Sequence, residues 1–136
     1  MIIIVDSDGL IGTSQEDDAH YSNSILLLQK LTRAKARLIY PATVIAEATA
    51  ILQIRLNRQE TANKIFELVK TGAFTIEPIN QEILTTAIRL LKTNRNKHAT
   101  LFDAIVATVA QKYNADAIFS FDNFYKKKGF KLASEL

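Results

Sequence analysis

Ile2-Ile3-Ile4-Val5-Asp6-Ser7-Asp8-Gly9 is the stretch that decides the fold. Its first four residues are apolar and β-branched, which is the pattern of a strand buried on both faces of a parallel sheet. The run ends abruptly at Asp6, which is the first of three polar residues. A charged side chain directly after such a strand lies near a buried edge, so it needs polar partners.

The rest of the chain alternates short apolar runs with longer helical patterns. Further strands are expected at residues 38–40, 74–76 and 117–119, and residues 130–132 are a candidate fifth. Apolar residues at helical spacing predict helices around residues 25–31, 44–52, 65–69, 83–91 and 101–110. Asn80 and Thr100 are suitable N-caps, and Gly72 is placed to end a helix. Strands that alternate with helices predict an α/β domain around a mostly parallel sheet.

The composition fits one domain that spans residues 1–136. The chain has 136 residues, of which 48% are hydrophobic, and this is enough apolar material for one core. Without cysteine it has no disulfide or thiolate chemistry, and it fits a reducing compartment. No run approaches the roughly 20 apolar residues of a membrane span, and the start of the chain lacks a secretory signal pattern. A cytoplasmic protein without a membrane partner is expected.

Basic residues gather late in the chain, although the net charge is only +3. They are Arg95, Lys97, His98, Lys112, Lys126, Lys127, Lys128 and Lys131. This distribution permits an anionic partner without requiring one, because such lysines are most often solvated surface. The segment 93–99 is expected to be an exposed loop. The other histidine, His20, has no neighbouring pattern that predicts a catalytic triad.

Four acids occupy the positions where ligands bind in open parallel sheets, beyond the carboxyl ends of the strands. Asp6 directly follows the first strand, and Asp122 lies three residues after the strand that ends at Phe119. Glu47 is in the first or second turn of the helix after Pro41, and Asp103 is in the first turn of the helix capped by Thr100. If both helices begin at the same edge of the sheet, the four carboxylates converge there.

Each acid also has a structural interpretation that the sequence leaves open. Asp103 completes a capping box with Thr100, and Asp122 is placed to cap a short helix through Phe124 and Tyr125. Glu47 is of the type that is usually a solvated helix residue. The functional interpretation therefore rests on the joint pattern.

Carboxylates that face one another repel and raise one another's pKa unless a cation compensates. Ligand sets made only of oxygen suit Mg²⁺ or Mn²⁺, whereas zinc usually recruits histidine or cysteine. An ion held in this way can activate a water for attack on phosphorus and neutralise the leaving oxygen.

Four segments together resemble the PIN domain family over nearly the whole chain. They are Ile3-Ile4-Val5-Asp6-Ser7, the stretch from Pro41 to Glu47, Leu101-Phe102-Asp103-Ala104-Ile105-Val106-Ala107-Thr108 and Ile118-Phe119-Ser120-Phe121-Asp122. The order and spacing of the acids are moderately specific. The helix from Asp103, followed by a strand and Ser120-Phe121-Asp122, is the strongest part.

The resemblance implies a three-layer α/β/α domain with a central sheet of four or five strands. It implies Mg²⁺- or Mn²⁺-dependent cleavage of RNA, leaving a 5′-phosphate and a 3′-hydroxyl, with the metal held by Asp6, Glu47, Asp103 and Asp122. Ser120 matches a catalytic position that usually holds Thr or Ser, whereas Asp8 matches a variable one. No further acid follows Asp122 closely, unlike in some relatives, which weakens the case for a second tightly held metal.

The length of the chain resembles that of VapC-like toxins, which implies a small antitoxin partner. Homodimers are common among such toxins. The apolar helices after Ala42 are either a dimer interface or part of the core.

Two alternatives remain open on the sequence. Asp6-Ser7-Asp8-Gly9-Leu10 resembles the opening motif of haloacid-dehalogenase-like phosphatases, with Asp6 as nucleophile and Asp8 as general acid, but Glu47 and Asp103 are then unexplained. The second alternative is a PIN-like module that binds RNA or protein without catalysis, and the retention of all four acids argues against it.

Overall fold

The computed structural model describes residues 1–93 and 98–136 of the chain. Its sheet contains four parallel strands, β1 (Ile2–Val5), β2 (Arg37–Pro41), β3 (Thr75–Glu77) and β4 (Ala117–Phe119). They lie in the order β3-β2-β1-β4. Ile4 pairs with Ile39 on one side and with Ile118 on the other. The first strand of the chain is therefore central, which explains its continuous apolar sequence.

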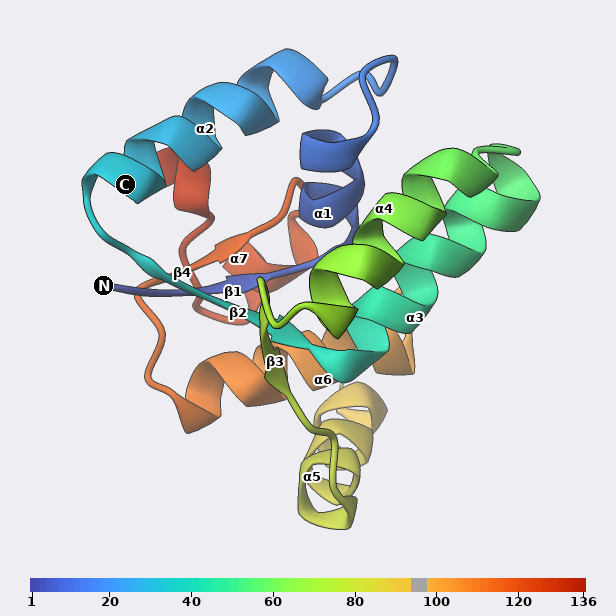
Figure 1. Ribbon diagram of the computed structural model, residues 1–136. Helices are drawn as coiled ribbons and strands as arrows, with labels where there is room; N and C mark the ends of the chain where they lie inside the picture. The colour runs from blue at the N-terminus through green and yellow to red at the C-terminus, as the bar shows by residue number, and fades with distance from the viewer. Residues whose placement is uncertain (94–97) are drawn as a thin grey trace.

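Helices cover both faces of this sheet. Their bounds are α1 (Ser7–Ser14), α2 (Tyr21–Arg33), α3 (Ala42–Ala50), α4 (Gln59–Lys70), α5 (Gln81–Lys92), α6 (Leu101–Lys112) and the short α7 (Phe124–Lys127). A π-helical turn, η1 (Ile51–Arg55), extends α3, and a 3₁₀ turn, η2 (Ala133–Glu135), lies near the C-terminus. In Figure 1, α2 lies on one side of the sheet and α6 on the other. This is the three-layer α/β/α arrangement that the sequence predicted.

The core is built around β1 and α6. Ile3 and Ile4 have no exposed surface, and every residue of α6 from Ala104 to Ala110 is buried. A helix that is apolar on all sides must be enclosed. It contacts β1, β2, α3 and α5. The alanines Ala104, Ala107 and Ala110 let neighbouring elements approach it closely.

The predicted elements are largely confirmed, with four differences. The strand predicted at residues 74–76 lies one residue later, and residues 130–132 supply only an isolated bridge between Leu132 and Ile118. Helix α1 was not predicted, because Gly9 and Gly12 interrupt its apolar pattern and glycine has a low helix propensity. The helices predicted around residues 44–52 and 65–69 are α3 and α4, and the π-helical turn η1 between them was not predicted. Most of the predicted loop 93–99 lies outside the described residues.

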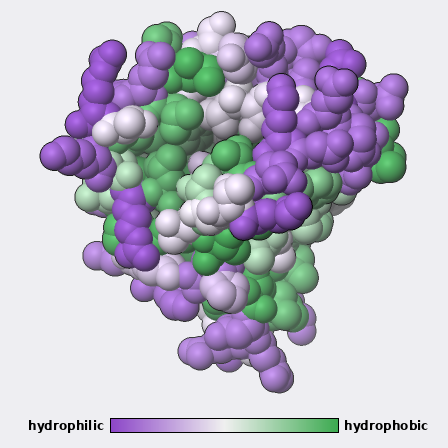
Figure 2. Space-filling model, in the orientation of Figure 1, coloured by the Kyte–Doolittle hydropathy of each residue, from purple (hydrophilic) through white to green (hydrophobic). Residues whose placement is uncertain are grey.

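Apolar residues after Ala42 divide between the core and the surface. Val44, Ala48 and Leu52 are buried, whereas the Ile54 side chain in η1 is 85% exposed. Figure 2 shows hydrophilic residues over α4 and an apolar group at the right edge, where η1 and α4 meet. The dimer interface predicted for this segment stays a prediction. Among the described residues, no helix has both the length and the apolar character needed to cross a bilayer.

Gly9 lets the first turn of α1 pack directly against the end of β4. A Cβ atom at this position would lie 2.4 Å from the carbonyl oxygen of Phe119 and 2.7 Å from its ring. Alanine normally improves a helix by up to about 1 kcal/mol over glycine. Here we expect Gly9→Ala to lower the free energy of unfolding by about 1–3 kcal/mol in urea denaturation.

Gly12→Ala in the same helix is the matched control. Its Cβ would lie 2.4 Å from Oγ of Ser24, a side-chain atom that can rotate away, whereas the Phe119 carbonyl belongs to the sheet. We therefore expect a smaller loss than for Gly9→Ala. Equal stability of the two variants would contradict the contact between α1 and β4.

Candidate active site

Asp6 lies at the carboxyl end of the central strand, where β1 meets α1. Its backbone N–H donates to the carbonyl of Phe119 at 3.1 Å, which joins it to β4. Its Oδ1 accepts the N–H of Ser7 at 2.8 Å and so caps α1. The residue is only 4% exposed. Asp6 is therefore fixed at a buried edge and hydrogen-bonded there, as its position in the sequence predicted.

Ser120 connects the ends of β1 and β4. Its Oγ donates to Oδ2 of Asp6 at 2.9 Å and lies 3.3 Å from Oδ2 of Asp8. The same oxygen accepts the N–H of Asp122 at 3.1 Å. A hydroxyl has one proton to donate, so the shorter contact assigns that proton to Asp6. Ser120 thus positions Asp6 and the loop that carries Asp122.

Asp8 has a structural role that the sequence did not assign. Its Oδ2 accepts the N–H of Phe121 at 3.0 Å, which ties α1 to the segment after β4. Its Oδ1 is buried and has no hydrogen-bond partner among the described residues. An orphaned, buried carboxylate oxygen is costly unless a proton or a cation satisfies it.

Glu47 and Asp103 enter from the two helices that begin at the same edge of the sheet. Glu47 is half-buried in α3, where burial raises its pKa and a hydrogen bond from the Ser7 side chain offsets part of that rise. Asp103 is half-buried in the first turn of α6, where its Oδ2 accepts the N–H of Thr100 at 2.8 Å. Asp122 is exposed, and its Oδ1 accepts the N–H of Phe124 at 2.9 Å, at the start of α7. The capping functions predicted for Asp103 and Asp122 are both present.

These acids influence one another's charge. We call the carboxylates of Asp6, Asp8, Glu47, Asp103 and Asp122 the acidic cluster. Burial and the nearby Asp8 charge raise the pKa of Asp6 to about 8, and Asp103 adds to this rise. Burial also raises the pKa of Glu47, with contributions from Asp103 and Asp8. The structure thus brings Asp6, Glu47, Asp103 and Asp122 to one edge of the sheet.

The remaining shifts in the acidic cluster have the same origin. Burial raises the pKa of Asp8 and of Asp103, and in both the charge of Asp122 contributes. None of the ion pairs between described residues includes a member of the cluster. The cluster therefore holds negative charge that is offset by hydrogen bonds and by protonation.

The cluster has the donor chemistry of a divalent-cation site but an open arrangement. Among the described residues, no three acidic, histidine or cysteine side chains are close enough to enclose an ion. Asp103 and Asp122 are turned toward the backbone groups that they cap. Carboxylate oxygens, mutual repulsion and the orphaned Oδ1 of Asp8 nevertheless fit Mg²⁺ or Mn²⁺.

Tyr125 lies behind the acidic cluster and was not identified from the sequence. The residue has no exposed surface, and its hydroxyl has no hydrogen-bond partner among the described residues. Burial raises its pKa well above the ordinary value, and the charges of Asp6 and Asp103 add to the shift. The phenol therefore stays neutral beside the carboxylates. The position of the Tyr125 hydroxyl could be found only from the tertiary structure, because in the sequence an aromatic residue after Phe124 looks like an ordinary core residue.

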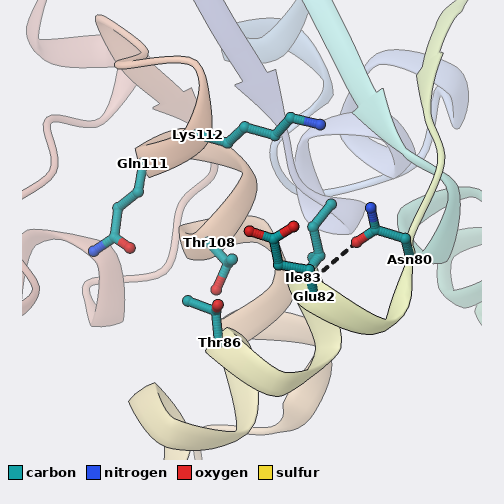
Figure 3. Close-up of a pocket in the computed structure, with 7 residues that line it drawn as sticks. All are labelled: Asn80, Glu82, Ile83, Thr86, Thr108, Gln111 and Lys112. Atoms are coloured by element: carbon teal, nitrogen blue, oxygen red, sulfur yellow. Dashed lines mark hydrogen bonds between the residues drawn. The ribbon is translucent and has the colours of Figure 1, made fainter.

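A cavity of about 350 Å³ lies between α5 and α6, away from the acidic cluster. Figure 3 shows its lining residues, Asn80, Glu82, Ile83, Thr86, Thr108, Gln111 and Lys112. No member of the acidic cluster lines it, and Lys112 is paired with the buried Glu77 at 2.7 Å. We therefore place the candidate active site at the acidic cluster and not in this cavity.

The basic residues considered for RNA binding have different surroundings. Lys126 and Lys127 are exposed on α7, and Lys126 forms an ion pair with Glu135 at 3.5 Å. Lys128 is half-buried. Arg95 and Lys97 lie outside the described residues. Their contact with RNA stays a prediction.

Comparison with known proteins identifies the family. The family model described as PIN domain matches residues 3–131, and the chain belongs to the PIN domain family. Among solved structures, the toxin VapC20 of Mycobacterium tuberculosis, described as cleaving the sarcin-ricin loop, superposes with a TM-score of 0.81. The two chains are 17% identical, and the match covers 94% of this chain and 95% of that one.

Two further structures have the same fold. VapBC2 of Rickettsia felis, bound to a DNA fragment from its promoter, gives a TM-score of 0.66 at 15% identity, with 97% of each chain covered. FitAB bound to the IR36 DNA fragment gives 0.62 at 14% identity, covering 98% of this chain and 91% of that one. A search of curated protein sequences finds no match. The family assignment removes the haloacid-dehalogenase alternative.

The raised pKa of Asp6 predicts how stability depends on pH without metal. Asp6 keeps a proton in the folded protein up to about pH 8, whereas the unfolded chain releases it near its ordinary pKa of 3.8. The folded state binds more protons in this window, so the free energy of unfolding falls as pH rises through it. In chelator, we expect a loss on the order of a few kcal/mol between about pH 5 and pH 8 by urea denaturation.

Asp6→Asn should make this dependence shallower, because an amide has no proton to lose in the window. Glu67→Gln on α4 is the control, since the Glu67 side chain is 66% exposed and lies outside the acidic cluster. The control should keep the wild-type slope. A wild-type slope in Asp6→Asn would mean that Asp6 does not carry the effect.

Ser120→Ala should cost roughly 1–3 kcal/mol of stability, because it leaves Oδ2 of the buried Asp6 carboxylate without its hydroxyl donor. The cost should be larger at pH 8 than at pH 5, where protonated Asp6 needs that donor less. Ser120→Thr keeps the hydroxyl and should lose much less in the same denaturation measurements. Equal losses for both variants would show that side-chain volume matters here and not the hydrogen bond.

Proposed function

We propose that this protein is a metal-dependent endoribonuclease that hydrolyses RNA phosphodiesters, and that Asp6, Glu47, Asp103 and Asp122 hold the Mg²⁺ or Mn²⁺ ion. The observation that carries the proposal is the acidic cluster itself. Carboxylates from four separate segments lie at one edge of the sheet, where burial and the neighbouring acids raise the pKa values of Asp6, Glu47 and Asp103. An arrangement that is costly in the metal-free protein is typical of a site that exists for a ligand.

The chemistry follows from the positions of the side chains. A bound Mg²⁺ or Mn²⁺ supplies positive charge that favours deprotonation of water and stabilises charge on the phosphate. Asp6 provides its carboxylate from the end of β1 and Glu47 from α3, whereas Asp103 comes from α6 and Asp122 from the segment after β4. Ser120 fixes the orientation of Asp6 through the 2.9 Å hydrogen bond, which is the role of a positioning residue.

Membership of the PIN domain family and the fold shared with VapC20 support RNA as the substrate. The similarity to VapBC2 and FitAB supports a role as the toxin of a toxin–antitoxin pair, with a small antitoxin as partner. The exposed Ile54, Leu56 and Leu68 are compatible with a protein partner or with a homodimer.

Cleavage of RNA by the purified protein tests the proposal. We expect cellular RNA to be cut in Mn²⁺ or Mg²⁺, with 5′-phosphate ends, and to stay intact in chelator. Asp6→Asn and Asp103→Asn should each reduce the rate roughly a hundredfold or more, because loss of groups that only orient metal ligands already costs about 10–100-fold. Metal binding measured by calorimetry should weaken in the same variants.

Glu82→Gln is the control, because Glu82 is an exposed acid on α5 outside the acidic cluster. It should leave both cleavage and metal binding unchanged. Cleavage that persists in chelator or in Asp6→Asn would refute the mechanism. RNA that binds but is not cut in either metal would instead favour a non-catalytic PIN-like module.

A further inference from the structure

A second cavity shares a wall with the acidic cluster. It has a volume of about 260 Å³ and is lined by Ser7, Asp8, Ile11, Asp18, His20, Ile51, Arg55 and Leu56. We call it the His20 cavity. Ser7 and Asp8 belong both to this lining and to the first turn of α1, directly after Asp6. The cavity therefore adjoins the candidate active site through Asp8.

The His20 cavity is large enough for one chemical group of a ligand but too small for a whole drug-sized molecule. Pockets for drug-sized ligands usually measure about 300–1,000 Å³, and the His20 cavity is smaller. Three apolar side chains line it, from Ile11, Ile51 and Leu56, together with the five polar or charged residues Ser7, Asp8, Asp18, His20 and Arg55. This combination fits a flat, partly apolar ring system that belongs to a larger molecule.

His20 offers a platform for such a ring. Its imidazole stacks on the ring of Phe121, with centroids 4.0 Å apart and an angle of 5° between the planes. His20 lines the cavity whereas Phe121 does not, so Phe121 supports one face of the imidazole. Phe121 is itself fixed by its N–H bond to Asp8 and lies between Ser120 and Asp122. The platform is thus attached to the segment that carries Ser120 and Asp122.

The loop that carries His20 is held in place from several sides. The N–H of His20 donates to Asp18 at 2.9 Å. The neighbouring Asp17 pairs with Arg58 at 2.7 Å, and the side chain of Gln15 bonds to Asp17 and accepts from Thr61. A ring held by its surroundings loses little entropy when it stacks on a ligand.

The π-helical turn η1 and the residue after it form another part of the lining of the His20 cavity. The N–H of Leu56 donates to the carbonyl of Ile51 at 3.0 Å, five residues earlier. In a π turn, residues i, i+4 and i+5 share a face, whereas in an α-helix i+5 turns away. Ile51, Arg55 and Leu56 therefore all line the cavity. Such turns are frequent at functional sites.

Resting on the proposed function, we propose that the His20 cavity receives an unpaired nucleobase of the RNA substrate next to the scissile phosphate. Single-stranded RNA is recognised chiefly by stacking of its bases on aromatic rings. The base stacks on the free face of His20 and contacts Ile51 and Leu56. Arg55, which forms none of the ion pairs between described residues, contacts the adjoining phosphate.

Fluorescence of 2-aminopurine tests this proposal without requiring cleavage. Short single-stranded RNA oligonucleotides carry the probe at one position at a time and are titrated with the protein in chelator. We expect quenching at one position. His20→Ala should abolish it and weaken binding roughly tenfold, whereas His20→Phe retains a ring and should preserve both. Arg55→Ala should weaken binding, and Arg89→Ala, an exposed arginine on α5, should not.

The outcomes separate this inference from the proposed function. Binding and Mn²⁺-dependent cleavage without quenching at any position, or quenching that persists in His20→Ala, would overturn the base site and leave the ribonuclease intact. Quenching without cleavage would support the base site and refute catalysis. If no RNA is bound while His20→Ala disrupts the complex with a co-expressed partner protein, the cavity belongs to that partner and the inference is wrong.

Discussion

Asp6 directly follows the central strand of the sheet, so its carboxylate lies at a buried edge where a negative charge is costly. Desolvation and the neighbouring acids raise its pKa to about 8. The surrounding structure compensates through the Ser7 N–H and the Ser120 hydroxyl. The architecture of this edge, from the first turn of α1 to the loop after β4, follows from the need to hold that carboxylate.

The need to stabilise clustered carboxylates explains why three aspartates at this edge cap helices and also lie where the proposed ion would bind. Asp6 caps α1, Asp103 completes the capping box of α6, and Asp122 binds the first N–H of α7. Each acid is thus stabilised in the metal-free protein by backbone donors at a helix start, where negative charge is also favoured by the helix dipole. Capping and metal binding are therefore not competing explanations. The caps keep the carboxylates in place at the edge where the proposed ion would bind.

The small residues of this region reflect close packing between α1 and β4. Gly9 brings the helix within contact distance of the Phe119 carbonyl, and this approach places Asp8 within reach of Phe121 and Ser120. A larger residue would separate the two segments and with them the acids. The His20 platform depends on the same approach, because Phe121 is fixed by Asp8.

Several features could be predicted from the sequence. They are the order of strands and helices, the burial of Ile2–Val5 on both faces of the sheet, the caps at Asn80 and Thr100, and the places of the four acids after strands or near helix starts. These features are local, since they depend on periodicity, capping chemistry and the rule that parallel strands end at one edge. Four other features could not be predicted. They are helix α1, the hydrogen bond of Asp8 with Phe121, the buried Tyr125 hydroxyl and the stack of His20 on Phe121. Helix α1 contains two glycines and packs through Gly9 against β4. The other features depend on residues far apart in the sequence, and only tertiary packing determines which polar groups are buried together and which are left without partners.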